Sequence, residues 1–437
     1  MDTYATKVNG IGGKIREKYE DFLVEEIGPG GLIASRSITH KGLGGNFTWL
    51  VMEKRGLNTI EAIRRLARAL RVRIGDLYYA GLKDAKAITL QFISYKGDLP
   101  SIGEVDGSGK VRVVASFKMP FNITPSLLQG NRFTITIRKV ALSKSEVERR
   151  FKYFFNEINE AGGLPSYYGY QRFGTIRPNT HIIGFYLIKG MFKEAVEELI
   201  GKVYPKEREE VKEAREIALG GNYKEALKLM PRSLRYERII LSHLLKRKND
   251  YLGALRRLPF TVRRLFVEAF QSYLFNRVIS LRILKELPLN RALIGDKVGM
   301  LDRMGNVTGV LTVNEVNLCK VNELIAKGKL CLVLNVFGYE TILSKGEQGE
   351  IEREVLKEEG ITLADFKVKH FPEASSKGYY RIASFKPEGL KVINISEDEI
   401  YSGTLKLTLS FSLRKGLYAT VFLRELMKPE DVVRAGL

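Results

Sequence analysis

Two amphipathic segments that lie far apart in the chain constrain its fold more than any other feature. RFTITIRKV (132–140) alternates apolar and polar residues, and TLKLTLSFSL (404–413) places its leucines and phenylalanine on one face. A period of two is typical of a half-buried β-strand. Between them, the stretch from roughly 190 to 285 has mainly helical patterning. The sequence therefore predicts a sheet domain that is split by an insertion.

The chain before residue 165 predicts further strands and a well-marked helix. Asn58 and Glu61 form the start of a helix whose apolar stripe is Ile60, Ile63, Leu66 and Leu70. Its arginine-rich opposite face either contacts phosphates or is simply solvated. The predicted strands are 21–27, 47–54, 88–95 and 111–117.

The net charge points to a polyanionic partner. Lys and Arg number 71 and Asp and Glu number 50 among 437 residues, which gives a net charge of +21. The excess is spread along the chain, and no basic amphipathic tail stands apart, so nucleic acid is favoured over an anionic membrane. The alternative is the charged surface of a thermophile, but such surfaces usually raise Glu along with Lys. We therefore expect a nucleic-acid partner.

Cysteine and histidine usage excludes several classes of protein. Cys319 and Cys331 show no CxxC spacing, and the four histidines are scattered, so neither a disulfide scaffold nor a zinc site is expected. The N-terminus is polar, and no apolar run approaches the ~20 residues that cross a bilayer. We expect a cytoplasmic protein with no membrane partner.

Common cofactor motifs are also missing. The chain has no GxxxxGK[ST] and no GxSxG, and its glycine-rich GPGGL and GLGGN stretches fit turns better than a dinucleotide site. We therefore expect no nucleotide cofactor. This leaves basic enzymes that work through carboxylates.

The segment YYAGLKDAKAITLQFIS (78–94) is the strongest candidate for such chemistry. Asp84 lies between Lys83 and Lys86, on a connection that leads into a predicted strand. A held carboxylate can act as a nucleophile or stabilise an oxocarbenium ion at a sugar anomeric carbon. A charged surface turn is the plain alternative. Lys83 either pairs with Asp84 or points to solvent and a phosphate, and the residues alone leave both open.

GLKDAKAITLQ resembles the signature of the TruD family of tRNA pseudouridine synthases. Four other stretches resemble motifs of this family, in the family's order, and together the matches run from residue 15 to 426. These stretches are IREKYEDFLVEE (15–26), GNRF (130–133), GGLPSYYGYQRFG (162–174) and LSFSLRKGLYATVFLREL (409–426).

The resemblance implies roles for individual residues. Asp84 matches the catalytic aspartate, and Lys83, which precedes it in the motif, is expected to be catalytic with it. The residues expected to bind the substrate are Phe22, Asn131, Phe133, Tyr418 and Arg16. Tyr418 falls where the family commonly has Phe, and it can still stack on a base, although its hydroxyl needs a partner. Arg16 falls where Lys is frequent, so the charge is kept but the geometry is not.

Two of these residues have plain alternatives. Phe133 shares a face with Ile135 and Ile137, so core packing is as well supported as stacking on a base. Asn131 either bonds a uracil edge or shapes a turn after Gly130, and its position in the motif favours the first.

These observations combine into one expected architecture. We expect an α/β (α+β) protein whose catalytic pseudouridine synthase domain, with a mixed or antiparallel sheet, comprises residues 1–165 and 392–437. An inserted α+β TRUD domain would span 166–391, and RNA would bind in a basic cleft between the domains. The basic helical segment near 190–285 either grips the RNA or is a solvated surface.

The resemblance implies isomerisation of uridine to pseudouridine in tRNA, typically at uridine 13 of the D-arm, without a metal or other cofactor. We expect a monomer. The alternative is a non-catalytic RNA-binding or RNA-folding protein on the same fold, against which the intact GLKD, GNRF and YAT motifs argue. A two-metal nuclease would need clustered carboxylates and a methyltransferase a glycine-rich donor loop, and neither is found.

Overall fold

The computed structural model describes residues 3–99, 103, 105, 107–302 and 306–437, and it divides into two compact units. The first unit is Ala161–Phe385 together with the N-terminal residues up to Ala5, and the second is Thr6–Glu160 with Lys386–Leu437. The divisions lie close to the predicted boundaries at 165 and 391. The assignment of the second unit as the catalytic domain stays a prediction.

The second unit is built on a mixed sheet, as predicted. Within the described residues the sheet has eight strands in the order β13-β14-β6-β1-β4-β2-β5, with β3 paired to β4. β1 and β4 are parallel, and the other pairs are antiparallel. The strands are β1 Phe22–Ile27, β2 Phe47–Arg55, β3 Tyr78–Tyr79, β4 Ile88–Lys96, β5 Val111–Met119, β6 Gly130–Val140, β13 Glu388–Glu397 and β14 Leu405–Arg414.

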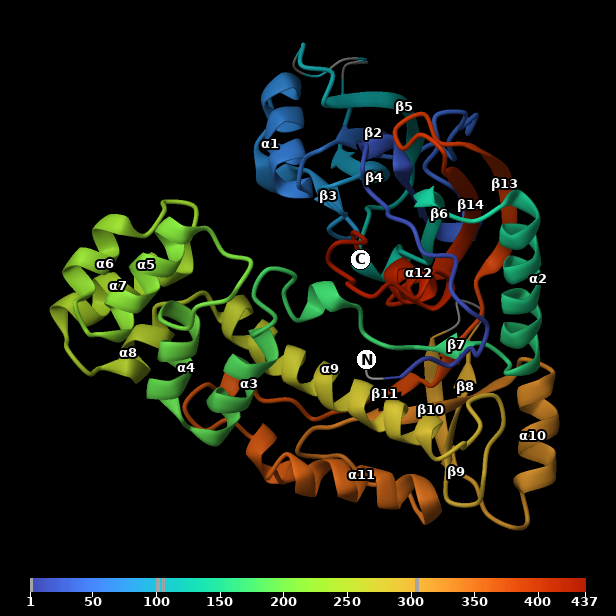
Figure 1. Ribbon diagram of the computed structural model, residues 1–437. Coiled ribbons are helices and arrows are strands. Elements are labelled where there is room, and N and C mark those ends of the chain that lie inside the picture. Colours follow the sequence, from blue (N-terminus) through green and yellow to red (C-terminus); the bar gives the residue numbers. More distant parts are fainter. Residues whose placement is uncertain (1–2, 100–102, 104, 106, 303–305) are drawn as a thin grey trace. The chain divides into compact units, whose positions relative to one another are not determined.

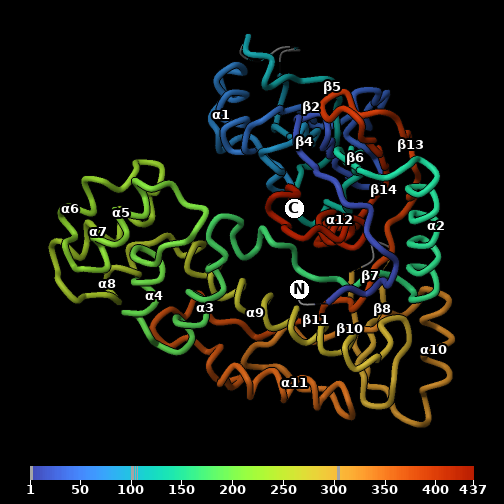
Figure 2. Tube along the Cα trace, viewed as in Figure 1, coloured from blue at the N-terminus to red at the C-terminus, as the bar shows by residue number. Residues whose placement is uncertain are grey.

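The two amphipathic segments of the sequence pair directly with each other. β14 runs antiparallel to β6, with Phe411 opposite Phe133 and Leu413 opposite Asn131. In Figure 2 the red C-terminal trace of β13 and β14 continues the sheet that the blue and teal N-terminal strands begin. The sheet therefore forms only when strands that precede residues 161–385 in the sequence pair with strands that follow them.

The helices of the second unit are α1 Thr59–Leu70, α2 Lys144–Glu160 and α12 Ala419–Met427 (Figure 1). The Asn58 side chain accepts a hydrogen bond of 2.9 Å from the backbone N–H of Glu61, which begins α1 as predicted. The buried face of α1 includes Ile63, while Ile60 is 38% exposed, contrary to the predicted stripe.

A row of phenylalanine rings joins α2 and α12 to the sheet. The Phe422 ring of α12 lies 4.5 Å from Phe411 of β14 and 5.7 Å from Phe154 of α2, measured between ring centroids. Aromatic pairs at such separations add to the free energy gained from burial. This row therefore fixes both helices against the C-terminal strand.

The first unit is mainly helical and has its own small sheet of strand order β11-β10-β8-β9. Its longest helix is α9 Phe260–Leu284, and no helix in the described part of the chain is long and apolar enough to cross a membrane. Its other main elements are α3 Thr180–Lys189, α4 Phe192–Ile200, α5 Glu209–Leu219, α6 Tyr223–Leu229, α7 Arg235–Lys246, α8 Tyr251–Arg256, β8 Lys297–Leu301, β9 Val307–Thr312, α10 Leu318–Ala326, β10 Leu330–Val336, α11 Gly346–Glu358 and β11 Tyr379–Ile382.

Some positive charge of the basic helical segment is internal to the first unit. Arg215 of α5 is fully buried, and its guanidinium pairs with Glu207 at 2.7 Å and Glu237 at 3.2 Å. Such a residue cannot contact RNA. Part of this segment's charge therefore stabilises its own helices.

Phe154→Ala should lower the free energy of unfolding of the second unit by about 3–5 kcal/mol, because Phe154 is 1% exposed and packs on Phe422. Phe155→Ala is the control, since this neighbour is 41% exposed and should change stability by no more than about 0.5 kcal/mol. The single tryptophan, Trp49, lies buried in β2 of the same unit, so its fluorescence during guanidinium denaturation measures the change. Equal effects of the two substitutions would contradict the packing described.

Candidate active site

The loop at residues 80–87 connects β3 to β4 and carries Asp84. Two side chains from neighbouring elements hold its backbone. The Lys83 N–H donates to Oγ1 of Thr59, at the start of α1, over 2.9 Å. The Lys54 ammonium, at the end of β2, donates to the backbone carbonyl of Asp84 over 2.6 Å. The main chain on both sides of the Lys83–Asp84 peptide is thus fixed by the sheet domain.

Lys54 is a buried cation whose contacts are backbone carbonyls. It is fully buried, and its Nζ donates to the carbonyl of Leu57 at 2.8 Å as well as to that of Asp84. Burial lowers the pKa of Lys54 to about 8; the charge of Lys83 acts in the same direction and that of Asp84 opposes it. One ammonium group therefore ties the turn after β2 to the loop that carries the candidate carboxylate.

Arg16 is the cation that faces the Asp84 carboxylate. Its Nη2 lies 3.6 Å from Oδ2 of Asp84, and the guanidinium lies over the Phe22 ring, 4.3 Å from the centroid. The side chains of Arg16 and Asp84 are 10% and 32% exposed. Burial lowers the pKa of Arg16, and Asp84 opposes that effect. The predicted grouping of Arg16, Asp84 and Phe22 is thus present, with the carboxylate open to solvent.

Lys83 takes neither of the two positions that the sequence left open. Its ammonium lies 2.9 Å from a carboxylate oxygen of Glu26 and donates to Oδ1 of Asn131 at 2.9 Å. Glu26 of β1 and Asn131 of β6 lie opposite each other in the antiparallel pair of these strands. Lys83 therefore contacts both strands at the same position of the sheet. Burial raises the pKa of Glu26, and Lys83 opposes that effect. Lys83 therefore anchors the loop to the sheet instead of pairing with Asp84.

The predicted aromatic residues divide into buried and half-buried ones. Phe22 and Phe133 are 1% and 6% exposed, and they pack edge to face with centroids 6.2 Å apart. Phe133 also stacks on Phe411 at 5.5 Å. The burial of Phe133 between Phe22 and Phe411 agrees with core packing, one of the two alternatives that the sequence left open, and the Phe22 ring is covered in part by Arg16. That either ring binds the substrate stays a prediction. Tyr418 is half-buried immediately before α12.

A polar groove of about 790 Å³ adjoins this cluster. It shares Arg16 with the Asp84 pair, and its walls carry five cations, three carboxylates and a tyrosine. The lining residues are Arg16, Glu17, Lys18, Tyr19, Glu20, Arg55, Lys86, Arg138 and Glu399. The groove can thus accept a charged, partly aromatic ligand next to the carboxylate.

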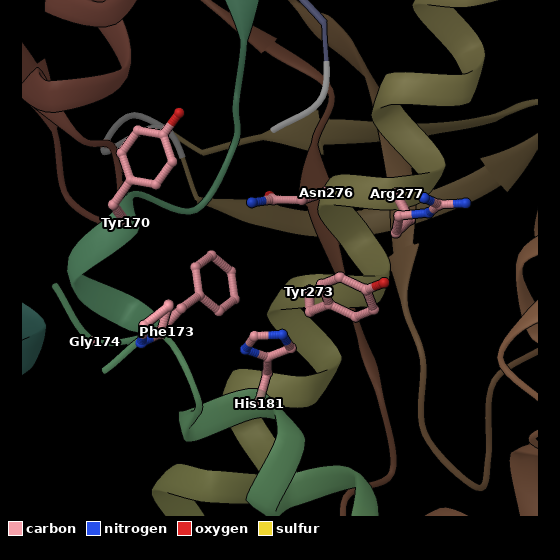
Figure 3. Close-up of a pocket in the computed structure, with 8 residues that line it drawn as sticks. Tyr170, Phe173, Gly174, His181, Tyr273, Asn276 and Arg277 are labelled. Carbon is pink, nitrogen blue, oxygen red and sulfur yellow. The ribbon is translucent and has the colours of Figure 1, made fainter. Parts of the chain in front are cut away.

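A smaller pocket of about 180 Å³ lies within the first unit, around the QRFG block of the sequence. Figure 3 shows Phe173, Tyr273 and His181 around a common space, and the His181 and Tyr273 rings stack at 4.8 Å. Burial lowers the pKa of His181 to about 4, so this imidazole is neutral at pH 7. The lining residues in the described part of the chain include no Asp or Glu. This pocket lacks the carboxylate that the candidate chemistry needs.

Two site residues escaped the sequence analysis. Lys54 ends a strand in MEKRG and Glu26 lies in FLVEE, where each resembles an ordinary surface charge. The available signal was their position in apolar strands, since a charged residue flanked by strand-forming residues is either solvated or paired inside the fold. In the structure both residues are paired inside the fold, Lys54 with the carbonyl of Asp84 and Glu26 with the ammonium of Lys83. These partners are distant in the sequence, so no local pattern shows them.

The pKa of Lys54 makes the stability of the second unit depend on pH. Unfolding returns this lysine from a pKa of about 8 to its ordinary value of 10.5, so between these pH values the unfolded chain binds more protons. The free energy of unfolding, taken relative to Lys54→Met, should therefore be flat below pH 8 and rise as the pH increases towards 10.5. Trp49 fluorescence in guanidinium at several pH values measures this difference. A difference that stays constant across the series would refute the buried-cation interpretation.

Comparison with known proteins identifies the family. The sequence model of the family "tRNA pseudouridine synthase D (TruD)" matches residues 1–426. A protein of Methanococcoides burtonii named "Probable tRNA pseudouridine synthase D" is 37% identical over 443 residues, which cover 99% of this chain and 97% of that protein. A protein of the same name from Methanopyrus kandleri is 38% identical over 390 residues, or 89% of this chain and 87% of its own.

The fold comparison agrees with the sequence comparison. The crystal structure of a protein described as "Putative tRNA pseudouridine synthase D (TruD)" from Methanosarcina mazei superposes with a TM-score of 0.83 at 34% identity. The superposition covers 99% of this chain and 97% of that one. Because sequence and fold match over nearly the whole length, the chain belongs to the TruD family of tRNA pseudouridine synthases.

Proposed function

We propose that this pseudouridine synthase acts on tRNA, that it modifies uridine 13 of the D-arm, and that Asp84 is its catalytic carboxylate. The observation that carries the proposal is the Asp84 side chain itself. It is partly open to solvent, faces Arg16 at 3.6 Å and stands on a loop whose carbonyl is bound by Lys54. The names of the relatives support tRNA as the substrate, and the motif that holds Asp84 supports its role.

The reaction requires a carboxylate that reaches the sugar of a nucleotide. The C1′–N1 bond of the target uridine breaks, the uracil turns in place, and C5 forms a new bond to C1′. C5 then loses its proton while N1 gains one, so the product is an isomer and no external oxidant or reductant takes part. Asp84 either attacks C1′ or removes a sugar proton that is later returned, and both routes need the charged oxygen to be held still.

The residues around Asp84 suit this chemistry because they hold the backbone of its loop in place. The Lys54 ammonium donates to the carbonyl of Asp84, while Lys83, the residue before Asp84, binds Glu26 and Asn131 through its own ammonium group. A carboxylate on a fixed backbone loses little freedom when the substrate binds. The target base must leave its stack in the RNA before C1′ is accessible. Tyr418, half-buried before α12, is the proposed contact for that base.

Wild-type protein incubated with unmodified tRNA transcripts, without added cofactor, should form pseudouridine that carbodiimide primer extension maps to position 13. Asp84→Asn should lower kcat by more than about 10³-fold because the amide can neither attack C1′ nor accept a proton. Asp76→Asn is the matched control, because that side chain is 35% exposed, against 32% for Asp84, and pairs with an arginine in the same unit.

The outcomes of this experiment separate the parts of the proposal. A product at another uridine would correct the target and leave Asp84 as the catalytic residue. Full activity of Asp84→Asn would remove Asp84 from the mechanism. Tight binding of transcripts by the wild type with no product in any RNA would favour the non-catalytic RNA-binding alternative.

The net charge of +21 predicts that RNA affinity depends steeply on salt. If six or more phosphates are contacted, the binding constant should fall by about 10³-fold or more between about 50 and 200 mM salt, because condensed counterions are released. Filter binding of the Asp84→Asn protein over a salt series measures the slope without turnover. A slope near zero would contradict a binding mode that relies on phosphate contacts.

A further inference from the structure

Tyr19 is an exposed aromatic residue in the groove beside the candidate active site. Tyr19 begins the short 3-10 helix Tyr19–Asp21, immediately before β1, and it is 43% exposed. Tyr19 and Arg16 line the same groove, and Arg16 also pairs with Asp84. An exposed ring in the groove that Arg16 shares with the candidate carboxylate is a surface that a ligand can cover.

The Tyr19 ring packs against two neighbouring residues of the protein. It lies against the backbone of Gly56, where an added Cβ would be only 2.6 Å from Cζ of Tyr19. Gly56 also has a φ of 64°, which a residue without a side chain adopts most easily. The Arg55 guanidinium lies 5.7 Å from the ring centroid and pairs with Glu20. The ring is therefore supported by Gly56 and Arg55 and still keeps an exposed part.

Lys86 adds a cation to the same groove. It follows Asp84 by two residues, is exposed, and lines the groove together with Tyr19. In the described part of the chain, the Lys86 ammonium has no ion-pair partner, whereas Arg55 pairs with Glu20 and Lys18 with Glu399. An ammonium without an ion-pair partner, in the same groove as an exposed ring, suits a phosphate next to a base.

We propose that Tyr19 is a stacking platform for the base of the nucleotide adjacent to the target uridine, and that Lys86 binds the phosphate of that nucleotide. This inference rests on the proposed function, since it assumes a uridine at Asp84. When the target base leaves the RNA stack, its neighbour loses a stacking partner. Tyr19 replaces that partner, and any base can be accepted because every base has an aromatic face.

The test is a double-mutant cycle between protein and RNA. Transcripts with a single abasic nucleotide, placed in turn along the D-arm, are bound to wild-type and Tyr19→Leu proteins that both carry Asp84→Asn, and Kd is measured. On intact tRNA, Tyr19→Leu should weaken binding by about 5- to 150-fold, the range that one base stack contributes. On the transcript that is abasic beside the target uridine, the same substitution should have no effect.

Two further variants separate stacking from other effects. Tyr19→Phe keeps the ring and should bind intact tRNA like the wild type. Tyr153→Leu is the matched control, because Tyr153 of α2 is 53% exposed and has Arg149 at 5.7 Å from its ring, the same separation as Arg55 from Tyr19. It lies outside the groove, so it should leave Kd unchanged. Trp49 fluorescence confirms that each variant is folded.

The possible results are distinct. Coupling confined to the neighbour of the modified uridine supports the platform. Equal weakening on every transcript, or coupling at a nucleotide distant from the modified uridine, overturns it. Because Kd is measured in the Asp84→Asn background, the binding result does not depend on turnover. If the wild type forms no pseudouridine, the proposed function fails, and coupling at a single nucleotide then supports base stacking on Tyr19 but overturns its assignment to the neighbour of a target uridine.

Discussion

The second unit depends on buried cations, which cannot be left without a counter-charge or hydrogen-bond acceptors. Lys54 is fully buried, the Lys83 side chain is 5% exposed, and Arg138 is 4% exposed. Placing a charge in the core costs several kcal/mol unless polar groups surround it. Each of these cations is therefore held at a defined position. Lys54 binds the carbonyls of Leu57 and Asp84, and Lys83 binds Glu26 of β1 and Asn131 of β6. The contacts that offset the burial of these two cations therefore also fix the loop that carries Asp84.

Arg138 is a buried cation whose partners come from both sequence segments of the split sheet domain. Its guanidinium bonds Asp21 at 2.9 Å, just before β1, and Asp398 at 2.9 Å, just after β13. A single side chain on β6 thus joins segments that come from either side of the first unit. The entropic cost of closing a loop grows only with the logarithm of its length, so a long insertion is tolerated between β6 and β13. The buried ion cluster and the β6–β14 ladder then specify how the two segments meet.

The strands were predictable because each has one apolar face, and a period of two is visible in a short window. The start of α1 was predictable from Asn58, but its stripe was not, since Ala62 and Ala67 pack inside while Ile60 is exposed. Asp84 and Arg16 could be singled out because the motifs that contain them are specific.

The partners of the buried charges could not be predicted in the same way. Lys83 binds Glu26 and Asn131, two residues that become neighbours only when β1 and β6 pair in one register. Lys54 meets the Asp84 carbonyl through a loop that no local pattern specifies. The openness of an aromatic ring is likewise a tertiary property. The motif that suggests a ligand contact for Phe22 does not show that Arg16 lies over its ring or that the residue is 1% exposed.

The backbone of Arg16 is strained at the candidate site. Its φ is 62°, a left-handed conformation that costs a non-glycine residue about 1–3 kcal/mol and persists only where neighbouring structure enforces it. Here the Ile15 N–H donates to the carbonyl of Ala435, and Nη1 of Arg16 donates to that of Gly436. These bonds hold the guanidinium between Asp84, Phe22 and the groove. A guanidinium held in one position needs little reorganisation to stabilise a negative charge placed beside it, and this is a physical reason for a strained residue at a candidate binding site.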